Sequence, residues 1–228
     1  MIANDNTPEI RQRLLEAAGE VFSERGFRDA TIREICERAK ANIAAVNYHF
    51  GEKEELYKAV FDYARGYAAG FDDANLSRER AEQRLHVFVY ATLARFFDEG
   101  RPAWLSKLVA QEMIHPTKML DLLVQHQIRP NSERLMVIVR ELIGREVDDE
   151  TLRLCVFSVV AQWLYYFHCG QVIKRLNPGQ RFGPLEIQRL ADHITRFSVT
   201  ALKGWMHATR ETCRDFGPLA RYKSEGHN

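Results

Sequence analysis

The sequence predicts an all-α protein with a three-helix head at the amino end and a larger helical body, about nine helices in total. Apolar residues recur three and four positions apart through most of the 228 residues, which is the period of a helix with one buried face. No segment shows the alternation of apolar and polar residues that indicates a half-buried strand. Residues 31–53, which predict two short helices joined by a tight turn, are the distinctive part of the head.

The first of these two short helices begins at Thr31. The Thr31 hydroxyl can accept the backbone N–H three residues on, and the Glu34 carboxylate can reach back, which together make a capping box. Lys40 and Ala41, after the helix, leave room only for a turn. An apolar stripe at helical spacing would hold this helix against a core, and it consists of Ile32, Ile35, Cys36 and Ala39.

The second short helix begins at Asn42, a residue type that caps helices well. Val46 and Phe50 lie four positions apart and can face a core, and Gly51 suits the left-handed residue that closes a helix. The positions left facing mostly outward are Ile43, Ala44, Asn47 and Tyr48. Two short helices with a tight turn, the second with a polar and aromatic outer face, match a helix-turn-helix.

Residues 42–53, with Tyr48, His49 and Phe50 followed by Lys53, resemble the recognition helix of the TetR family of transcriptional regulators. The run from Val46 to Gly51 more narrowly resembles the CerR-like branch. These motifs lie within about residues 9 to 60, and beyond them only the helical layout and length agree. Many family members have glycine where Lys40 stands, so we expect a strained or altered turn there.

The resemblance implies a sequence-specific DNA-binding transcriptional regulator, a repressor whose operator binding is released by a small-molecule effector. It divides the chain into a helix-turn-helix domain at residues 1–55 and an effector-binding and dimerisation domain at 56–228. Carried over residue by residue, the DNA-binding positions are Thr31, Arg33, Asn42, Ile43, Ala44, Ala45, Asn47, Tyr48, His49 and Lys53.

Several of these positions have a physical role to test. Asn47 can read adenine and Arg33 guanine, and such pairs discriminate by about 1–3 kcal/mol. Tyr48 and Lys53 suit phosphate contacts, which fix the register without reading sequence. Arg33 is equally well explained as a solvated helix residue, and His49 either contacts a phosphate or caps the helix end. Lys53 begins a helix, where a phosphate is favoured, or it pairs with the neighbouring glutamates.

Composition limits the alternatives. The net charge is only +1 and the first part of the chain is acidic, so DNA binding would depend on a few well-placed cations. Four cysteines without a CxxC pair favour buried thiols in a reducing cytoplasm. No apolar run reaches the ~20 residues that span a bilayer, and the amino end has no signal-peptide pattern. We therefore expect a cytoplasmic protein that does not bind membranes.

The remaining helices are predicted from apolar stripes and from the glycine and proline residues that end or interrupt helices. We expect one helix at residues 9–25, which Gly26 ends, and a second at residues 52–70. A third would begin at a cap on Ser77 and end at Gly100. A polar break would separate the last two at residues 70–75. Pro102 suits the first position of the next helix, and residues 117–143 predict further helix, interrupted near Pro130.

Two long helices near the carboxyl end predict a homodimer. The helix expected from Asp148 to Arg175 is apolar on two sides, so it needs partners on both. Pairing with the last helix and the same two helices of a second copy would give a four-helix interface. Two recognition helices about 34–36 Å apart then imply a palindromic double-stranded DNA operator. The stripe expected on the last helix is Ile187, Leu190, Ile194, Phe197, Ala201 and Trp205.

Functions other than DNA binding are less well supported by the sequence. Glu112 and His115 form an ExxH pair, but di-iron bundles need two such pairs. We therefore expect that the protein binds no metal and no cofactor and is not an enzyme. An effector cavity would be mainly apolar with a few polar anchors, although an aromatic stripe is equally a core or an interface. A regulator controlled by a partner protein, or a metal-binding bundle enzyme, are the alternatives. Candidate cavity residues are Trp104, Gln111, Glu112, Met113, Tyr165, Tyr166 and His168.

Overall fold

A computed structural model describes residues 8–66, 78–97, 102–144 and 146–204. Every regular element within these ranges is a helix, which confirms the predicted all-α class. None of the helices found there combines the length and the apolar character needed to cross a bilayer. The expected break at residues 70–75, Ser77, Gly100 and Trp205 lie outside the described residues.

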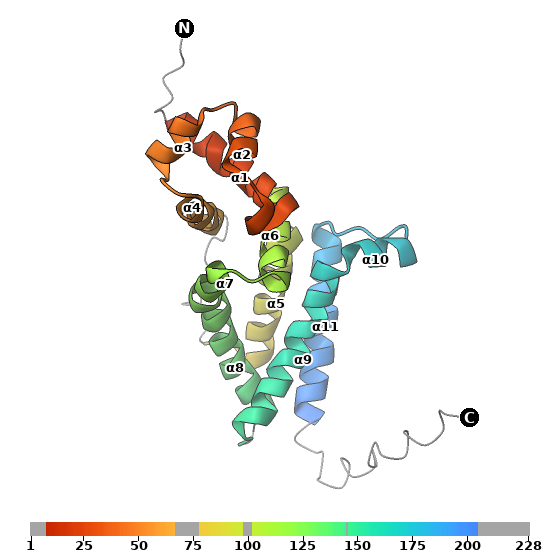
Figure 1. Cartoon of the computed structure of the whole chain (residues 1–228). Helices are drawn as coiled ribbons and strands as arrows, with labels where there is room; N and C mark the ends of the chain where they lie inside the picture. Colours follow the sequence, from red (N-terminus) through yellow and green to blue (C-terminus); the bar gives the residue numbers. More distant parts are fainter. Residues whose placement is uncertain (1–7, 67–77, 98–101, 145, 205–228) are drawn as a thin grey trace, which may run out of the picture.

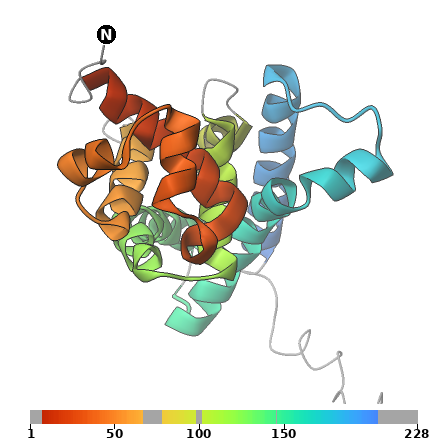
Figure 2. The same ribbon diagram turned by 45° about the horizontal axis from the view of Figure 1, so that its top comes forward.

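The head consists of α1 (Pro8–Asp29), α2 (Ile32–Ala39), α3 (Ile43–His49) and α4 (Lys53–Gly66). Figure 2 brings this group of helices, red to orange, toward the viewer. Helix α1 buries the expected face, including Leu14, Val21 and Phe22. Gly26, predicted to end the helix, has the non-helical values φ 75° and ψ 169°, and a further helical segment continues from there to Asp29.

The body contains α5 (Ala81–Phe97), α6 (Ala103–Ile114), α7 (Lys118–Leu123), the π-helix η1 (Val124–Ile128) and α8 (Arg129–Ile143). The long α9 (Asp149–His168), short α10 (Gly170–Leu176) and α11 (Pro184–Gly204) complete it, and α10 projects to one side (Figure 1). The break expected near Pro130 is confirmed: η1 precedes it, since proline has no N–H for a regular i→i−4 bond.

Two predicted features of the carboxyl-terminal helices need correction. The helix expected from Asp148 to Arg175 is interrupted at Cys169, whose φ of −101° and ψ of 17° depart from helical values. On α11 the buried face passes from Ile194 to Ser198 and Leu202, four residues at a time, whereas Phe197 and Ala201 are exposed. The predicted stripe was therefore wrong at Phe197 and Ala201, because it continued from Ile194 at a spacing of three where the helix buries residues at a spacing of four.

Buried apolar residues form two separate cores. The body core joins α5, α8, α9 and α11. The head core joins α1–α4 but also includes Leu105 and Leu108 of α6 and Leu123 of α7. Helix α6 therefore belongs structurally to the head core, although it follows α5 in the chain. The boundary expected at residue 55 stays a prediction, since helices beyond it complete the head core.

Helices α1 and α6 pack closely at Gly19. A Cβ atom on Gly19 would overlap the indole ring of Trp104, which is itself buried. Glycine is needed here because a side chain would fill the space that the indole occupies, and not because of its backbone conformation. Trp104, expected as an effector-cavity residue, is thus a packing residue between the head and α6.

Gly19→Ala should lower the free energy of unfolding by about 1–3 kcal/mol, since the overlap with Trp104 outweighs the higher helix propensity of alanine. Chemical denaturation of the full chain measures this. Gly170→Ala is the matched control in another helix, because its Cβ would meet nothing within 4 Å, and it should be neutral or stabilising. Equal stabilisation by both substitutions would contradict the packing described here.

Candidate nucleic-acid interface

Helix α2 begins with the predicted cap. The Thr31 hydroxyl accepts a hydrogen bond from the Glu34 N–H at 3.2 Å. The Glu34 carboxylate, expected to reach back to Thr31, instead lies 3.4 Å from Nε of Arg25 on α1. Ile35, Cys36 and Ala39 are buried as expected, and burial raises the pKa of the Cys36 thiol.

An ionic cluster also ties α2 to α1. The Arg38 guanidinium donates hydrogen bonds to both carboxylate oxygens of Glu24, at 3.0 and 2.9 Å, and it lies 3.5 Å from Glu20. The hydrogen bond from Arg38 lowers the pKa of the Glu24 carboxyl. Arg38 therefore neutralises acidic residues of α1 instead of adding positive potential to the head surface.

The turn of the helix-turn-helix has a left-handed lysine. Lys40 has φ 51° and ψ 46°, and its N–H caps α2 by donating to carbonyls of Cys36 and Glu37. The Arg13 guanidinium of α1 donates to the carbonyls of Ala39 at 2.8 Å and Lys40 at 2.9 Å. The conformation that glycine adopts most easily is thus taken by a lysine, as the departure at this position led us to expect, and Arg13 of α1 binds the carbonyls of the turn.

Helix α3 presents one face to the core and the other to solvent. The Asn42 side chain caps it, accepting the Ala45 N–H at 2.8 Å, and the Val46 side chain is 0% exposed. Ile43 is 52% and Tyr48 67% exposed, and Ala44 and Asn47 are exposed as well. We call Ile43, Ala44, Asn47 and Tyr48 the α3 outer face.

Ala45, also expected at the DNA surface, does not lie on the α3 outer face. Its side chain is 2% exposed and belongs to the head core. Position 45 follows Asn42 by three and precedes Val46, so it faces inward on a helix whose Val46 is buried. The side chain of Ala45 is therefore a core residue, and the family pattern alone placed it at the surface.

Three further predicted positions lie outside this face. Arg33 is exposed and forms an ion pair with Glu37 at 3.0 Å, which agrees with the solvated-helix alternative, and such a surface pair is weak enough to open. The His49 ring is half-buried, and its Nε2 has no hydrogen-bond partner among the described residues. The Lys53 amino group donates to the Arg28 carbonyl at 3.2 Å and lies over the Phe27 ring.

The structure does not show the pairing of Lys53 with the neighbouring glutamates, and the phosphate contact stays a prediction. The Lys53 amino group contacts α1 instead of the adjacent glutamates, and burial lowers its pKa. Arg11 was missed by the sequence reasoning. Its guanidinium lies 5.4 Å from the centroid of the Phe50 ring, at the carboxyl end of α3. Because 39 positions separate the two residues, no local pattern could have indicated the contact.

The seven candidate cavity residues are not brought together. Trp104 and Glu112 are buried beside the head core, Gln111 is half-buried and Met113 is exposed. On α9, Tyr165 and His168 are exposed and the half-buried Tyr166 contacts the rings of Tyr165 and Phe182. Two of the four α6 residues therefore serve the packing of the head, and the α9 residues form a separate aromatic group.

Glu112 has structural partners that account for its burial. Its carboxylate is 1% exposed and accepts hydrogen bonds from the Tyr57 hydroxyl at 2.6 Å and from the N–H and hydroxyl of Thr117 at 3.0 and 2.9 Å. We call these three residues the Glu112 cluster. His115, its partner in the ExxH pattern, is exposed, so the two side chains do not converge as metal ligands would.

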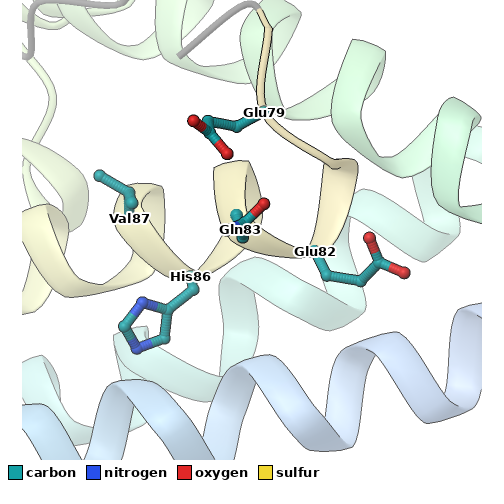
Figure 3. Close-up of a pocket in the computed structure, with 5 residues that line it drawn as sticks. All are labelled: Glu79, Glu82, Gln83, His86 and Val87. Atoms are coloured by element: carbon teal, nitrogen blue, oxygen red, sulfur yellow. The ribbon is translucent and has the colours of Figure 1, made fainter. Parts of the chain in front are cut away.

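A depression on α5, shown in Figure 3, is lined by Glu79, Glu82, Gln83, His86 and Val87. Two of its polar side chains already bind α11: Glu82 accepts from Lys203 at 2.7 Å, and His86 lies 2.7 Å from Asp192. In Figure 3 the His86 ring points from α5 toward α11. These polar groups therefore join two helices of the body, and no recognition chemistry is apparent here.

Two short capped helices, a fixed turn and an exposed outer face on the second helix define a helix-turn-helix DNA-binding protein. Residues 14–60 match the family model of bacterial regulatory proteins of the tetR family. Residues 81–202, more than half of the chain, match the C-terminal domain of the HTH-type transcriptional dual regulator CecR. The chain belongs to the TetR family of transcriptional regulators, whose members are regulators and not enzymes. The narrower CerR-like resemblance finds only loose support in these matches.

Individual proteins similar to this chain are transcriptional regulators as well. The transcriptional dual regulator CecR of Shigella flexneri is 24% identical over 174 residues, 69% of this chain and 75% of that protein. The transcriptional repressor NicS of Pseudomonas putida is 25% identical over 206 residues, 85% and 91% of the two chains. The solved TetR-family regulator PfmR of Thermus thermophilus has a TM-score of 0.60 at 21% identity, covering 83% of this chain and 95% of that chain, and shows the same fold.

Lys40→Gly should raise the free energy of unfolding by about 1 kcal/mol, because glycine adopts the left-handed conformation without steric cost. Lys40→Ala is the matched control: it removes the same charge but keeps a Cβ, so it should give no gain. Denaturant melts measure both.

The Arg13 side chain is bonded to carbonyls of this same turn. Arg13→Ala should cost about 1.5–3 kcal/mol, as expected for charged hydrogen bonds, and should cost less when Lys40 is already glycine. A double-mutant cycle measures this coupling. Strict additivity of the two substitutions would show that Arg13 does not support the turn.

Proposed function

We propose that this chain is a homodimeric, cytoplasmic repressor that binds a palindromic operator through the α3 outer face and is released by a small molecule. One observation supports it above others: Val46 anchors α3 in the head core, while Asn47 and Tyr48 remain exposed on its other side. A short helix fixed in this way can enter a major groove without rearrangement of the head.

The four residues of the outer face divide between reading and positioning. Asn47 is exposed and can make two hydrogen bonds to adenine, and Ile43 can pack on a thymine methyl. Ala44 is small enough for close approach of the helix to the base edges. Tyr48 suits a phosphate, since its exposed ring carries a hydroxyl donor near the end of α3.

Arg11, Arg33 and Lys53 are the cations that we assign to phosphates or bases around α3. Arg33 would exchange Glu37 for DNA at little cost, because the side chain is 84% exposed. Arg11 lies against Phe50, beside the end of α3. Lys53 begins α4, where a phosphate would be favoured by the helix dipole, although its amino group would have to leave the Arg28 carbonyl.

A second copy of the chain fits the exposed apolar side of α9. Leu154 and Phe157 are each 60% exposed, and Leu164 and Tyr165 continue the same side of the helix toward its end. Phe197 on α11 is also exposed, and its ring stacks on His193. Exposed apolar side chains gathered on two neighbouring helices favour an interaction site, and two helices from each copy would give the predicted four-helix interface.

Selection of operator sequences from random double-stranded DNA by the full chain tests the proposal. A palindromic consensus is expected, with binding that weakens steeply as salt rises. Tyr48→Ala should then weaken binding to all single-base operator variants alike, by removing a phosphate contact. Asn47→Ala should relax preference at one base pair in each half-site, by about 1–3 kcal/mol. A uniform loss for both variants would contradict the assignment.

Phe157→Glu should disrupt the dimer, because it places a charge in the apolar centre of the proposed interface. We expect the dimer dissociation constant to rise at least about thirtyfold, which corresponds to about 2 kcal/mol, and operator affinity to fall with it. Analytical ultracentrifugation measures the dissociation. Val137→Glu on α8 is the matched control, since Val137 is 57% exposed but lies outside α9 and α11. Equal behaviour of the two variants would argue against this interface.

A further inference from the structure

Helix α10 and the loop that follows it project from the body. We call residues 170–183 the α10 arm. It begins at the bend where Cys169, with φ −101° and ψ 17°, ends α9. In Figure 1 the arm extends to one side of α9 and α11, at the end of both helices that is nearer to the head.

Two side chains fasten the α10 arm to its own chain. Ile173 is buried. The Phe182 ring stacks on the Phe97 ring of α5, with the centroids 4.4 Å apart and the planes at 6°. Between these anchors the Asn177 carbonyl accepts the Gln180 N–H at 2.9 Å, which closes a turn. The arm therefore has a fixed direction, and a partner could bind it without first ordering it.

The α10 arm exposes an apolar face that its own chain leaves uncovered. Val172 and the 69% exposed Leu176 lie four positions apart, so both are on one face of α10. Leu164 and His168 of α9 precede them at the same spacing and are exposed too. A helix of seven residues is marginal without a well-packed face. The exposed side of α10 thus continues the α9 surface that we assign to the dimer.

Charged residues beside two exposed leucines are unpaired within the chain. Arg175, next to Leu176, donates to a carbonyl of its own helix at 3.1 Å and forms no ion pair among the described residues. Glu186, in the first turn of α11, has no hydrogen-bond or ion-pair partner among them either. It follows Leu185, which is 72% exposed. The end of α10 and the start of α11 are therefore complementary in charge, and both are apolar.

The symmetry of a dimer on DNA brings these two ends of different copies together. Both α3 helices must face one side of a duplex, so the two-fold axis runs from the heads along the bodies. Rotation about such an axis leaves every residue at the same height along it. The α10 arm of one copy therefore reaches the head-side end of the partner's body, where the partner's α11 begins (Figure 1).

We propose that the α10 arm is a dimerisation arm that crosses to a second copy of this chain and docks on the start of its α11. Leu176 packs on Leu185 of the partner subunit, and Arg175 pairs with Glu186 of the partner subunit. The contact occurs twice in each dimer, because a two-fold interface is reciprocal. The proposal rests on the homodimer proposed above and adds a contact outside its four-helix interface.

This contact decides which chains can pair. An apolar four-helix surface holds two chains together but discriminates little between similar chains. Charged pairs at the rim of an interface suppress wrong partners, because like charges that face each other repel. The α10 arm therefore selects identical copies and excludes regulators that carry other charges at the arm or at the start of α11.

Mixing two full-length, charge-reversed chains tests the contact. Homodimers of Arg175→Glu, and those of Glu186→Arg, join like charges at both contacts. Their dissociation constants should rise at least about fivefold, which corresponds to about 1 kcal/mol. In the heterodimer one contact is wild-type and the other is reversed but complementary. Heterodimers should therefore form at least about four-fifths of the dimers, compared with about half for random pairing. Native mass spectrometry separates the dimers, since the two substitutions shift the chain mass in opposite directions.

The matched control is a mixture of Arg140→Glu with Asp149→Arg. Arg140 and Asp149 are 3.6 Å apart within one chain, so each variant keeps its own like-charge contact in any dimer, and pairing should stay random. Random pairing of Arg175→Glu with Glu186→Arg as well would overturn the proposal.

Leu176→Asp tests the apolar part of the contact. It should raise the dimer dissociation constant at least about tenfold, which corresponds to about 1.4 kcal/mol. Ile114→Asp on α6 is the matched control, because Ile114 is 67% exposed but lies outside the arm and the dimer helices, and it should leave the dimer unchanged. Analytical ultracentrifugation measures both. A Leu176→Asp dimer as tight as the wild type would also refute the arm contact.

The homodimer and the arm can fail separately. A wild-type chain that sediments as a monomer at every concentration would refute the proposed homodimer and the arm together. A wild-type dimer whose charge-reversed variants pair at random would refute the arm alone and leave the dimer through α9 and α11.

Discussion

The arrangement of the head depends on one buried carboxylate. Glu112 is the charged residue buried among the described side chains, and it accepts hydrogen bonds from α4 and from the start of α7. A buried charge is costly unless its partners are all in place. Three elements, α4, α6 and α7, must therefore meet in one geometry for the carboxylate to be satisfied, whereas apolar contacts alone would tolerate sliding.

The packing of Trp104 against Gly19 adds a second constraint near the start of α6. Together, these contacts make α6 the surface on which both α1 and α4 rest. The head is then a unit built from residues 8–66 and from a helix nearly forty residues further on. This explains why a division of the chain into consecutive segments describes its folding only in part.

Local features of the fold were predictable because their causes are local. The caps at Thr31 and Asn42 each satisfy a backbone N–H within three residues, and the structure shows both. The strained turn at Lys40 was also indicated by a single position. What the sequence did not show were contacts between distant segments: Arg13 with the turn, Arg11 with Phe50, and Glu112 with Tyr57. The error at Phe197 has another cause, since stripes with spacings of three and four both fit a helix and only packing chooses between them.

The ionic cluster around Arg38 has a consequence for how such a protein finds its target. Arg38 is committed to Glu20 and Glu24, and the whole chain carries a charge of only +1. Attraction to arbitrary chromosomal DNA depends mainly on uncommitted cations, so few molecules would be sequestered on unrelated sequences. A small number of copies per cell would then suffice to occupy the operator, with discrimination coming chiefly from the bases themselves.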